Sequence, residues 1–227
     1  INSRNIFPNG GFELGSLYGW GMEAARDSSI LIITEPVLEG NYAAKLTLYP
    51  GDWASRGHRV ELKRPYCAEY QTEMVYSWSF KIGNNFKESD KQYLFHQFHD
   101  YPDFLNGETW ETMTVYPPPV FTAYLNDTVY FNMHSIEDGH RIIGKKEIVK
   151  GEWIKIKYKI KWSLGSDGYI ETYINNERII FINGHFRYYT PTVYNKMGNY
   201  LKIGLYTHPS VMDTNSIYID DLKIFYQ

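Results

Sequence analysis

Apolar and polar positions alternate along most of this chain. Alternation over four to nine residues is the pattern of a β-strand with one buried face and one solvated face. It predicts strands at 43–49, 58–64, 74–82, 92–99, 128–134, 152–162, 168–174, 178–182, 199–208 and 216–227. Turn-forming pairs such as Asn-Gly and Asp-Gly separate these segments, and no helical period extends beyond two turns. The pattern therefore predicts an all-β fold, a β-jelly roll built as a concanavalin-like sandwich of two antiparallel sheets, with residues 1–227 as a single domain.

The amino-acid composition indicates a folded protein and gives no sign of a nucleic-acid or membrane partner. The chain has 227 residues, of which 43% are hydrophobic and 17% aromatic, so it can bury a large core and still present rings for binding. A net charge of −3 gives no reason to expect nucleic acid or an anionic membrane as a partner. The single cysteine, Cys67, excludes an intramolecular disulfide. No apolar run is long enough to cross a bilayer. We expect the protein to be a monomer.

Three predicted strands combine an apolar face with a polar face, because residues two apart point to the same side of a sheet. On its polar face the strand at 92–99 should present Tyr93, Phe95, Gln97 and His99. The strand at 58–64 should present Arg59, Glu61 and Lys63. The strand at 199–208 should present Tyr200, Lys202, Gly204, Tyr206 and His208. One such strand is usually an ordinary solvated face, but three with groups suited to acid–base chemistry indicate a site.

Four motifs carry a family resemblance. In chain order they are RVELKR, QFHDYPD, GEWIKIKYKIKWSLGSDGYIETYINNERI and YLKIGLY. Their order and spacing resemble those of β-jelly-roll polysaccharide lyases, with the heparin lyase I and glucuronan lyase group most similar and alginate lyases more distant. The resemblance covers residues 40–227, and it implies cleavage of a uronic-acid-containing polysaccharide by β-elimination, without an organic cofactor.

The resemblance also implies roles for individual residues. His99 and Tyr206 would transfer protons, and the sequence leaves open which is base and which is acid. Arg59, Gln97 and Lys202 would hold the uronate carboxylate. Arg64 is an alternative arginine, but in a regular strand it would point to the opposite face from Arg59. Further candidate substrate contacts are Tyr200 and Tyr101, the latter in an irregular segment at 100–119 that should form a wall or lid.

The chemistry of β-elimination suits these residue types. The C5 proton of a uronate is only weakly acidic while the neighbouring carboxylate keeps its charge. Cations and amide donors offset the charge that develops on that carboxylate as the proton leaves. Imidazole, with an ordinary pKa of about 6.5, can accept a proton, and a phenol, at about 10, can protonate the leaving oxygen.

A second resemblance concerns the chain ends. NGGFELGSLYGW (9–20) and IYIDDLKI (217–224) look like the terminal strands of jelly-roll carbohydrate-binding modules, in which carboxylates bind a structural Ca²⁺. This implicates Glu13 and Asp220 as metal ligands. The alternative is that these carboxylates pair with Lys45 or Arg26. The same motif raises an alternative function, a non-catalytic carbohydrate-binding module, whereas a glycoside hydrolase would need two carboxylates flanking the bond.

Substrate and location follow from charge and chemistry. The site would carry local positive charge on a slightly acidic chain, which favours an unsulfated or lightly sulfated uronate polymer. An acidic polysaccharide substrate places the enzyme outside the cytoplasm, so we expect a secreted or periplasmic protein whose leader is not part of this sequence.

Overall fold

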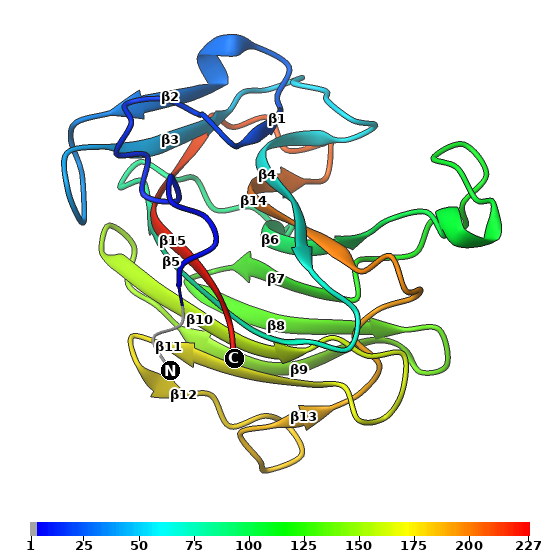
Figure 1. The fold of residues 1–227 in the computed structure, drawn as a ribbon. Helices are drawn as coiled ribbons and strands as arrows, with labels where there is room; N and C mark the ends of the chain where they lie inside the picture. Colours follow the sequence, from blue (N-terminus) through cyan, green and yellow to red (C-terminus); the bar gives the residue numbers. More distant parts are fainter. Residues whose placement is uncertain (1–3) are drawn as a thin grey trace.

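The computed structural model describes residues 4–227, and it consists of two antiparallel sheets packed face to face (Figure 1). The seven-stranded sheet runs, in spatial order, β1 (Gly21–Glu23), β4 (His58–Ala68), β14 (Asn199–Thr207), β6 (Tyr93–Asp100), β7 (Val120–Leu125), β8 (Thr128–Ser135) and β9 (Gly139–Glu147). The eight-stranded sheet runs β12 (Glu177–Arg178), β11 (Tyr169–Ile174), β10 (Trp153–Lys161), β5 (Glu73–Ile82), β15 (Asn215–Tyr226), β3 (Ala43–Leu48) and β2 (Ile30–Ile33), with β13 (Tyr188–Tyr189) also paired to β11. Two short 3₁₀ turns complete the elements, at Asp27–Ser29 and Phe104–Asn106. The predicted jelly roll is confirmed.

The core lies between the two sheets and fixes which way the polar faces point. In β14, the side chains of Leu201, Ile203 and Leu205 are fully buried in it. Burial of each such side chain stabilises the fold by about 1.5–3 kcal/mol. A slip of one residue would bring this apolar row into solvent, so the register of β14 is strongly specified. The intervening residues of β14 must then face away from the core.

Strand β6 departs from the alternation that the sequence predicts. Tyr93 and Phe95 pack in the core, whereas the sequence predicts them beside Gln97 and His99 on the polar face. The cause is a register shift between Leu94 and His96, where an extra residue is accommodated against β7. The irregularity turns Leu94 outward and leaves Gln97 and His99 on the outer face.

The predicted strand at 178–182 is largely wrong. Only Glu177–Arg178 pairs as β12, and residues 179–181 have no regular structure. The alternation is nevertheless present, since Ile180 and Ile182 are exposed while Ile179 and Phe181 are buried. The segment makes only isolated backbone hydrogen bonds to its neighbours, from the Ile179 N–H to β11 and from the Ile182 N–H to β9. The pattern also missed β7, the edge strands β2 and β9, and the short strands β1 and β13.

The segment 101–119 leaves β6 and projects from the body of the sandwich before β7 begins (Figure 1). It contains the 3₁₀ turn at Phe104–Asn106 and is otherwise irregular. Among residues 4–227, no helix is long and apolar enough to cross a membrane.

Candidate active site

A cavity of about 930 Å³ lies on the outer face of the seven-stranded sheet. Its floor comes from β4, β6 and β14, which are neighbours in that sheet, and the segment 101–119 forms one wall. It is lined by Glu23, Ser55, Arg56, Arg59, Lys63, Pro65, Tyr66, Leu94, Gln97, His99, Tyr101, Trp110, Met113, Val115, Tyr116, Pro117, Pro118, Phe121, Tyr200, Lys202 and Tyr206. The three polar faces that the sequence singles out therefore meet at one cavity.

Most of the predicted site residues line this cavity. They are His99, Tyr206, Arg59, Gln97, Lys202, Tyr200 and Tyr101. Arg64 is the exception: its guanidinium lies 4.4 Å from the ring centre of Phe7 and donates to the Gly19 carbonyl. Arg64 therefore lies outside the cavity, because successive residues of β4 point to opposite sides of the sheet and Arg59 and Lys63 point toward the cavity.

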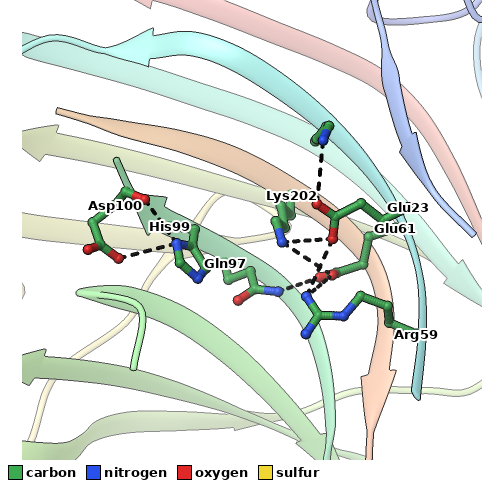
Figure 2. A network of polar contacts seen from close by, with 8 residues as sticks. Glu23, Arg59, Glu61, Gln97, His99, Asp100 and Lys202 are labelled. Atoms are coloured by element: carbon green, nitrogen blue, oxygen red, sulfur yellow. Dashed lines mark hydrogen bonds and ion pairs between the residues drawn. The ribbon is translucent and has the colours of Figure 1, made fainter. Parts of the chain in front are cut away.

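Beneath the cavity lies a buried network of charged groups (Figure 2). Glu61, fully buried, accepts a hydrogen bond from Arg59 Nη1 at 3.1 Å and from Gln97 Nε2 at 2.6 Å. Glu23 accepts from Lys202 Nζ at 2.8 Å and from Arg59 Nη1 at 3.4 Å. Cross-strand neighbours make this possible, because Lys202 is opposite Gln97 in β6 and Lys63 in β4. Three groups that the sequence assigns to the substrate are thus already held by carboxylates.

The network carries one excess positive charge. Its cations are Arg59, Lys202 and Lys63, the last 3.5 Å from Glu23, and its anions are Glu23 and Glu61. Burial by itself would raise the pKa of Glu23, but the attraction of Lys202, Arg59 and Lys63 outweighs it, and the pKa is lowered. Glu23 is therefore held as a carboxylate.

Arg59 also stacks on the candidate proton donor. Its guanidinium carbon lies 3.9 Å from the centre of the Tyr206 ring, and the two residues are directly paired between β4 and β14. Gly57 makes room for this stack: a Cβ there would lie 2.7 Å from Arg59 Nη2 and 2.8 Å from Tyr206 Cε2. The cation beside Tyr206 is therefore Arg59.

His99 is oriented by the next residue. Its Nδ1 lies 3.0 Å from the backbone carbonyl oxygen of Asp100 and 3.2 Å from that residue's carboxylate (Figure 2). A carbonyl oxygen only accepts, so Nδ1 carries the proton in this contact. In the neutral ring Nε2 then holds the free lone pair. The His99 ring stacks on Tyr200, with ring centres 5.3 Å apart.

The two tyrosines of β14 differ in environment. Tyr200 is only 7% exposed, and burial together with the nearby Glu23 and Asp100 carboxylates raises its pKa well above the ordinary value. Tyr206 is half-buried and lies against a cation. Of the two, Tyr206 is the more exposed, so its hydroxyl is the more accessible to a substrate in the cavity.

His99 and Tyr206 lie at opposite ends of the cavity floor. In the β6–β14 register His99 is opposite Tyr200, and Tyr206 is opposite Leu94. Leu94 and His99 are five positions apart, about 17 Å along a straight strand. Both side chains line the cavity, and Gln97 and Lys202 lie between them in the register of the sheet.

The segment 101–119 adds an aromatic wall. Tyr101 stacks on Tyr66 at 5.4 Å and lies 4.9 Å from Tyr200, and Trp110, 45% exposed, packs against both Tyr101 and Tyr200. Burial raises the pKa of Tyr101 to about 12. Its hydroxyl accepts a hydrogen bond from the backbone N–H of Tyr66. The cavity thus combines a charged floor with rings on which sugars can stack.

Sequence reasoning placed Glu61 and Lys63 on the polar face of the strand at 58–64 without predicting their partners, and it did not identify Glu23. Glu61 and Lys63 could have been predicted as neighbours of Arg59, because residues two apart in a strand lie on the same face. Glu23 comes from β1, a strand of three residues too short to show a period.

The predicted calcium ligands have other partners. Glu13 accepts backbone hydrogen bonds from Asn41 and Tyr42, and Asp220 accepts them from Leu38, Glu39 and Asp221. Within residues 4–227 no group of three or more His, Cys, Asp or Glu side chains is placed to hold a metal ion. Of the alternative partners, Lys45 and Arg26, Arg26 binds Asp52 instead.

His96 illustrates a histidine with no part in the site. It is 1% exposed, packs edge-on against Trp78, and burial lowers its pKa to about 3. The expectation that it packs inward is confirmed.

Solved structures with the same fold include enzymes of different chemistry. An endo-β-1,4-glucuronan lyase from the fungus Trichoderma reesei is 17% identical, with a TM-score of 0.75 over 99% of this chain and 96% of that one. The family 7 alginate lyase AlgAT5 is 16% identical, with a TM-score of 0.60 over 93% and 95%. A carbohydrate esterase from the Shiga toxin-encoding bacteriophage phi24B is 10% identical, with a TM-score of 0.62 over all of both chains. Such low identities show the fold alone.

The family assignment rests on the sequence itself. No curated protein matches the chain. The model of the polysaccharide lyase family, however, matches residues 12–223, which include every strand of the cavity floor. The chain belongs to the polysaccharide lyase family.

Proposed function

We propose that this lyase cleaves a uronic-acid-containing polysaccharide by β-elimination, with His99 and Tyr206 transferring the protons. The observation that carries the proposal is the meeting of both side chains at one cavity, above a floor with excess positive charge. The fold it shares with a glucuronan lyase and an alginate lyase supports the substrate class.

In the proposed reaction His99 Nε2 takes the proton from C5 of the uronate. The electron pair of the C5–H bond forms the C4–C5 double bond, and the bond from C4 to the glycosidic oxygen breaks. The Tyr206 phenol donates its proton to that oxygen, so one chain ends in an unsaturated sugar and the other in a free hydroxyl. The contact from Nδ1 to Asp100 keeps Nε2 available as the acceptor.

The floor stabilises charge on the substrate carboxylate. Lys202 has three N–H donors and two carboxylate neighbours, Glu23 at 2.8 Å and Glu61 at 4.0 Å, which leaves a donor for the substrate. Gln97 likewise uses one amide N–H on Glu61. Arg59 stacks on the ring of Tyr206 and holds the phenol in place at the cavity floor.

The two carboxylates at the floor do not suit a glycoside hydrolase. Such an enzyme needs one carboxyl group that is protonated and can donate to the leaving oxygen. Glu23 has a lowered pKa, and Glu61 is fully buried and paired with Arg59. Both instead serve to hold cations.

Several finer properties follow as parts of this proposal. One excess charge at the floor suits an unsulfated or lightly sulfated polymer better than a heavily sulfated one. We propose that residues 1–227 work as one monomeric domain, outside the cytoplasm, where such polymers are found. Structural calcium stays a prediction from the chain ends, but amide donors already satisfy Glu13 and Asp220, which favours a metal-free role for these carboxylates in holding the segment 38–42.

The test is a panel of uronate polymers, including glucuronan, alginate and heparan sulfate, followed by the ultraviolet absorbance of the unsaturated product. We expect absorbance to rise with at least one unsulfated polymer. Binding to a polymer without any product would favour the non-catalytic module instead.

A further inference from the structure

A second, smaller cavity of about 300 Å³ adjoins the active site. It is lined by Trp53, Arg56, Gly57, His58, Gln92, Leu94, Tyr206, Thr207, His208 and Pro209. Three of these residues, Arg56, Leu94 and Tyr206, also line the main cavity. The small cavity therefore lies next to Tyr206, at the end of the floor opposite His99.

The turn that carries Arg56 adopts an unusual backbone conformation. Ala54 and Gly57 are bridged by two backbone hydrogen bonds, of 2.9 Å and 3.0 Å, around Ser55 and Arg56. Both central residues have positive φ, 46° and 64°, as in the primed hairpin turns that usually contain Asn and Gly. Residues with a Cβ adopt this region at a cost, and such strain gathers at binding sites. The strain suggests that the position of Arg56 matters.

The same turn is fixed from below. His58 is 1% exposed, and its ring nitrogens lie 3.1 Å from the Tyr49 carbonyl oxygen and 3.3 Å from that of His208. This contact ties the start of β4 to the segment that follows β14. The walls of the small cavity are thus braced against each other, so the cavity is preformed.

Two side chains that line the small cavity, Trp53 and Arg56, make little contribution to the packing or ion pairing of residues 4–227. Trp53 is 57% exposed, although burying an indole would stabilise the fold. Within residues 4–227, Arg56 forms no ion pair, whereas the cations of the active-site floor are paired. An open ring beside an unpaired guanidinium complements a sugar that carries a carboxylate.

We propose that the small cavity binds one further uronate unit of the polysaccharide, on the Tyr206 side and beyond the two sugars that the cleaved bond joins. The indole of Trp53 packs against the sugar ring, and the Arg56 guanidinium pairs with its carboxylate. The inference rests on the proposed function, since it takes the substrate to be an acidic chain that crosses the cavity floor from His99 to Tyr206.

This subsite has a consequence for the pattern of cleavage. A chain that fills both cavities extends to either side of the broken bond, so the enzyme should cut within the polymer and release oligosaccharides. Substrates too short to reach Trp53 should lose the contribution of this contact and be cleaved less efficiently.

The experiment compares kcat/KM for a hexasaccharide and a trisaccharide of whichever uronate polymer the wild type cleaves. In the Trp53→Ala variant we expect the ratio of the two values to fall about tenfold, and Trp53→Phe should restore part of it. Arg56→Gln should also lower the ratio. Tyr18→Ala and Arg178→Gln, exposed residues outside both cavities, are the matched controls and should leave the ratio unchanged.

A ratio within twofold of the wild type in both Trp53→Ala and Arg56→Gln would overturn the subsite. That outcome leaves the proposed function intact, because the wild-type rate is measured independently. If the wild type forms no unsaturated product, the proposed function fails first. In that case, calorimetry should measure the affinity of wild type and Trp53→Ala for hexasaccharides of the panel polymers. Equal affinities of the two proteins, or no binding to the wild type, would count against the subsite.

Discussion

Replacing Glu61 by glutamine should strongly destabilise this protein. Glu61 is fully buried and holds Arg59 Nη1 at 3.1 Å and Gln97 Nε2 at 2.6 Å. Unit charges 3.1 Å apart attract by about 5 kcal/mol at an effective dielectric constant of about 20. Neutralising Glu61 also removes its own desolvation cost, so we expect a net loss of about 3–5 kcal/mol, the range seen when one partner of a buried ion pair is removed.

Urea unfolding followed by tryptophan fluorescence measures this loss as a change in the free energy of unfolding. The matched control is Glu177→Gln, which removes a 2.8 Å ion pair with Lys146 at an exposed site. There we expect a loss below about 1 kcal/mol. If Glu61→Gln also lost less than about 1 kcal/mol, the network would not hold the cavity floor together, and the account of Arg59 and Gln97 would be refuted.

Three further predictions concern packing, pH and metal. Gly57→Ala should disturb the Arg59–Tyr206 stack and lower kcat about tenfold to a hundredfold. Gly11→Ala is the control, because a Cβ there would have its nearest neighbour at 3.7 Å, and it should leave kcat unchanged. Equal kcat values for the two variants would refute this role of Gly57. The pKa of Glu23 is lowered from 4.5 in the folded protein, so its contribution to stability is complete above pH 4.5 and is lost as the pH falls through the lower folded pKa. The urea concentration at the unfolding midpoint should therefore decrease as the pH is lowered below about 4.5. Glu23→Gln should make that decrease smaller. EDTA should leave the melting temperature unchanged, and a rise on adding calcium would instead support the metal site.

The floor of the site was largely predictable from β14 and β4. Leu201, Ile203 and Leu205 form an unbroken apolar row, so period two places Lys202 and Tyr206 correctly on the opposite face. In β6 the same rule fails at Tyr93 and Phe95. A bulge depends on the register with neighbouring strands, which the pattern of a single strand does not contain.

Contacts between distant segments account for what the sequence could not predict. Glu23 pairs with Lys202 across 179 positions of the chain, and its strand β1 is too short to be recognised. The stack of Arg59 on Tyr206 depends on the pairing of β4 with β14 and on the space left by Gly57. Sequence spacing identified which residues face the cavity, but not which of them already have partners.

The central claim is that His99 is the base that acts on the uronate, and the most direct test is the turnover of His99→Ala. The rate of formation of unsaturated product should fall by about 10²- to 10⁴-fold, while near-ultraviolet circular dichroism shows an unchanged fold. His185→Ala, at an exposed position outside the cavity, should keep the wild-type rate. A folded His99→Ala variant with a rate within a few-fold of the wild type would contradict the account.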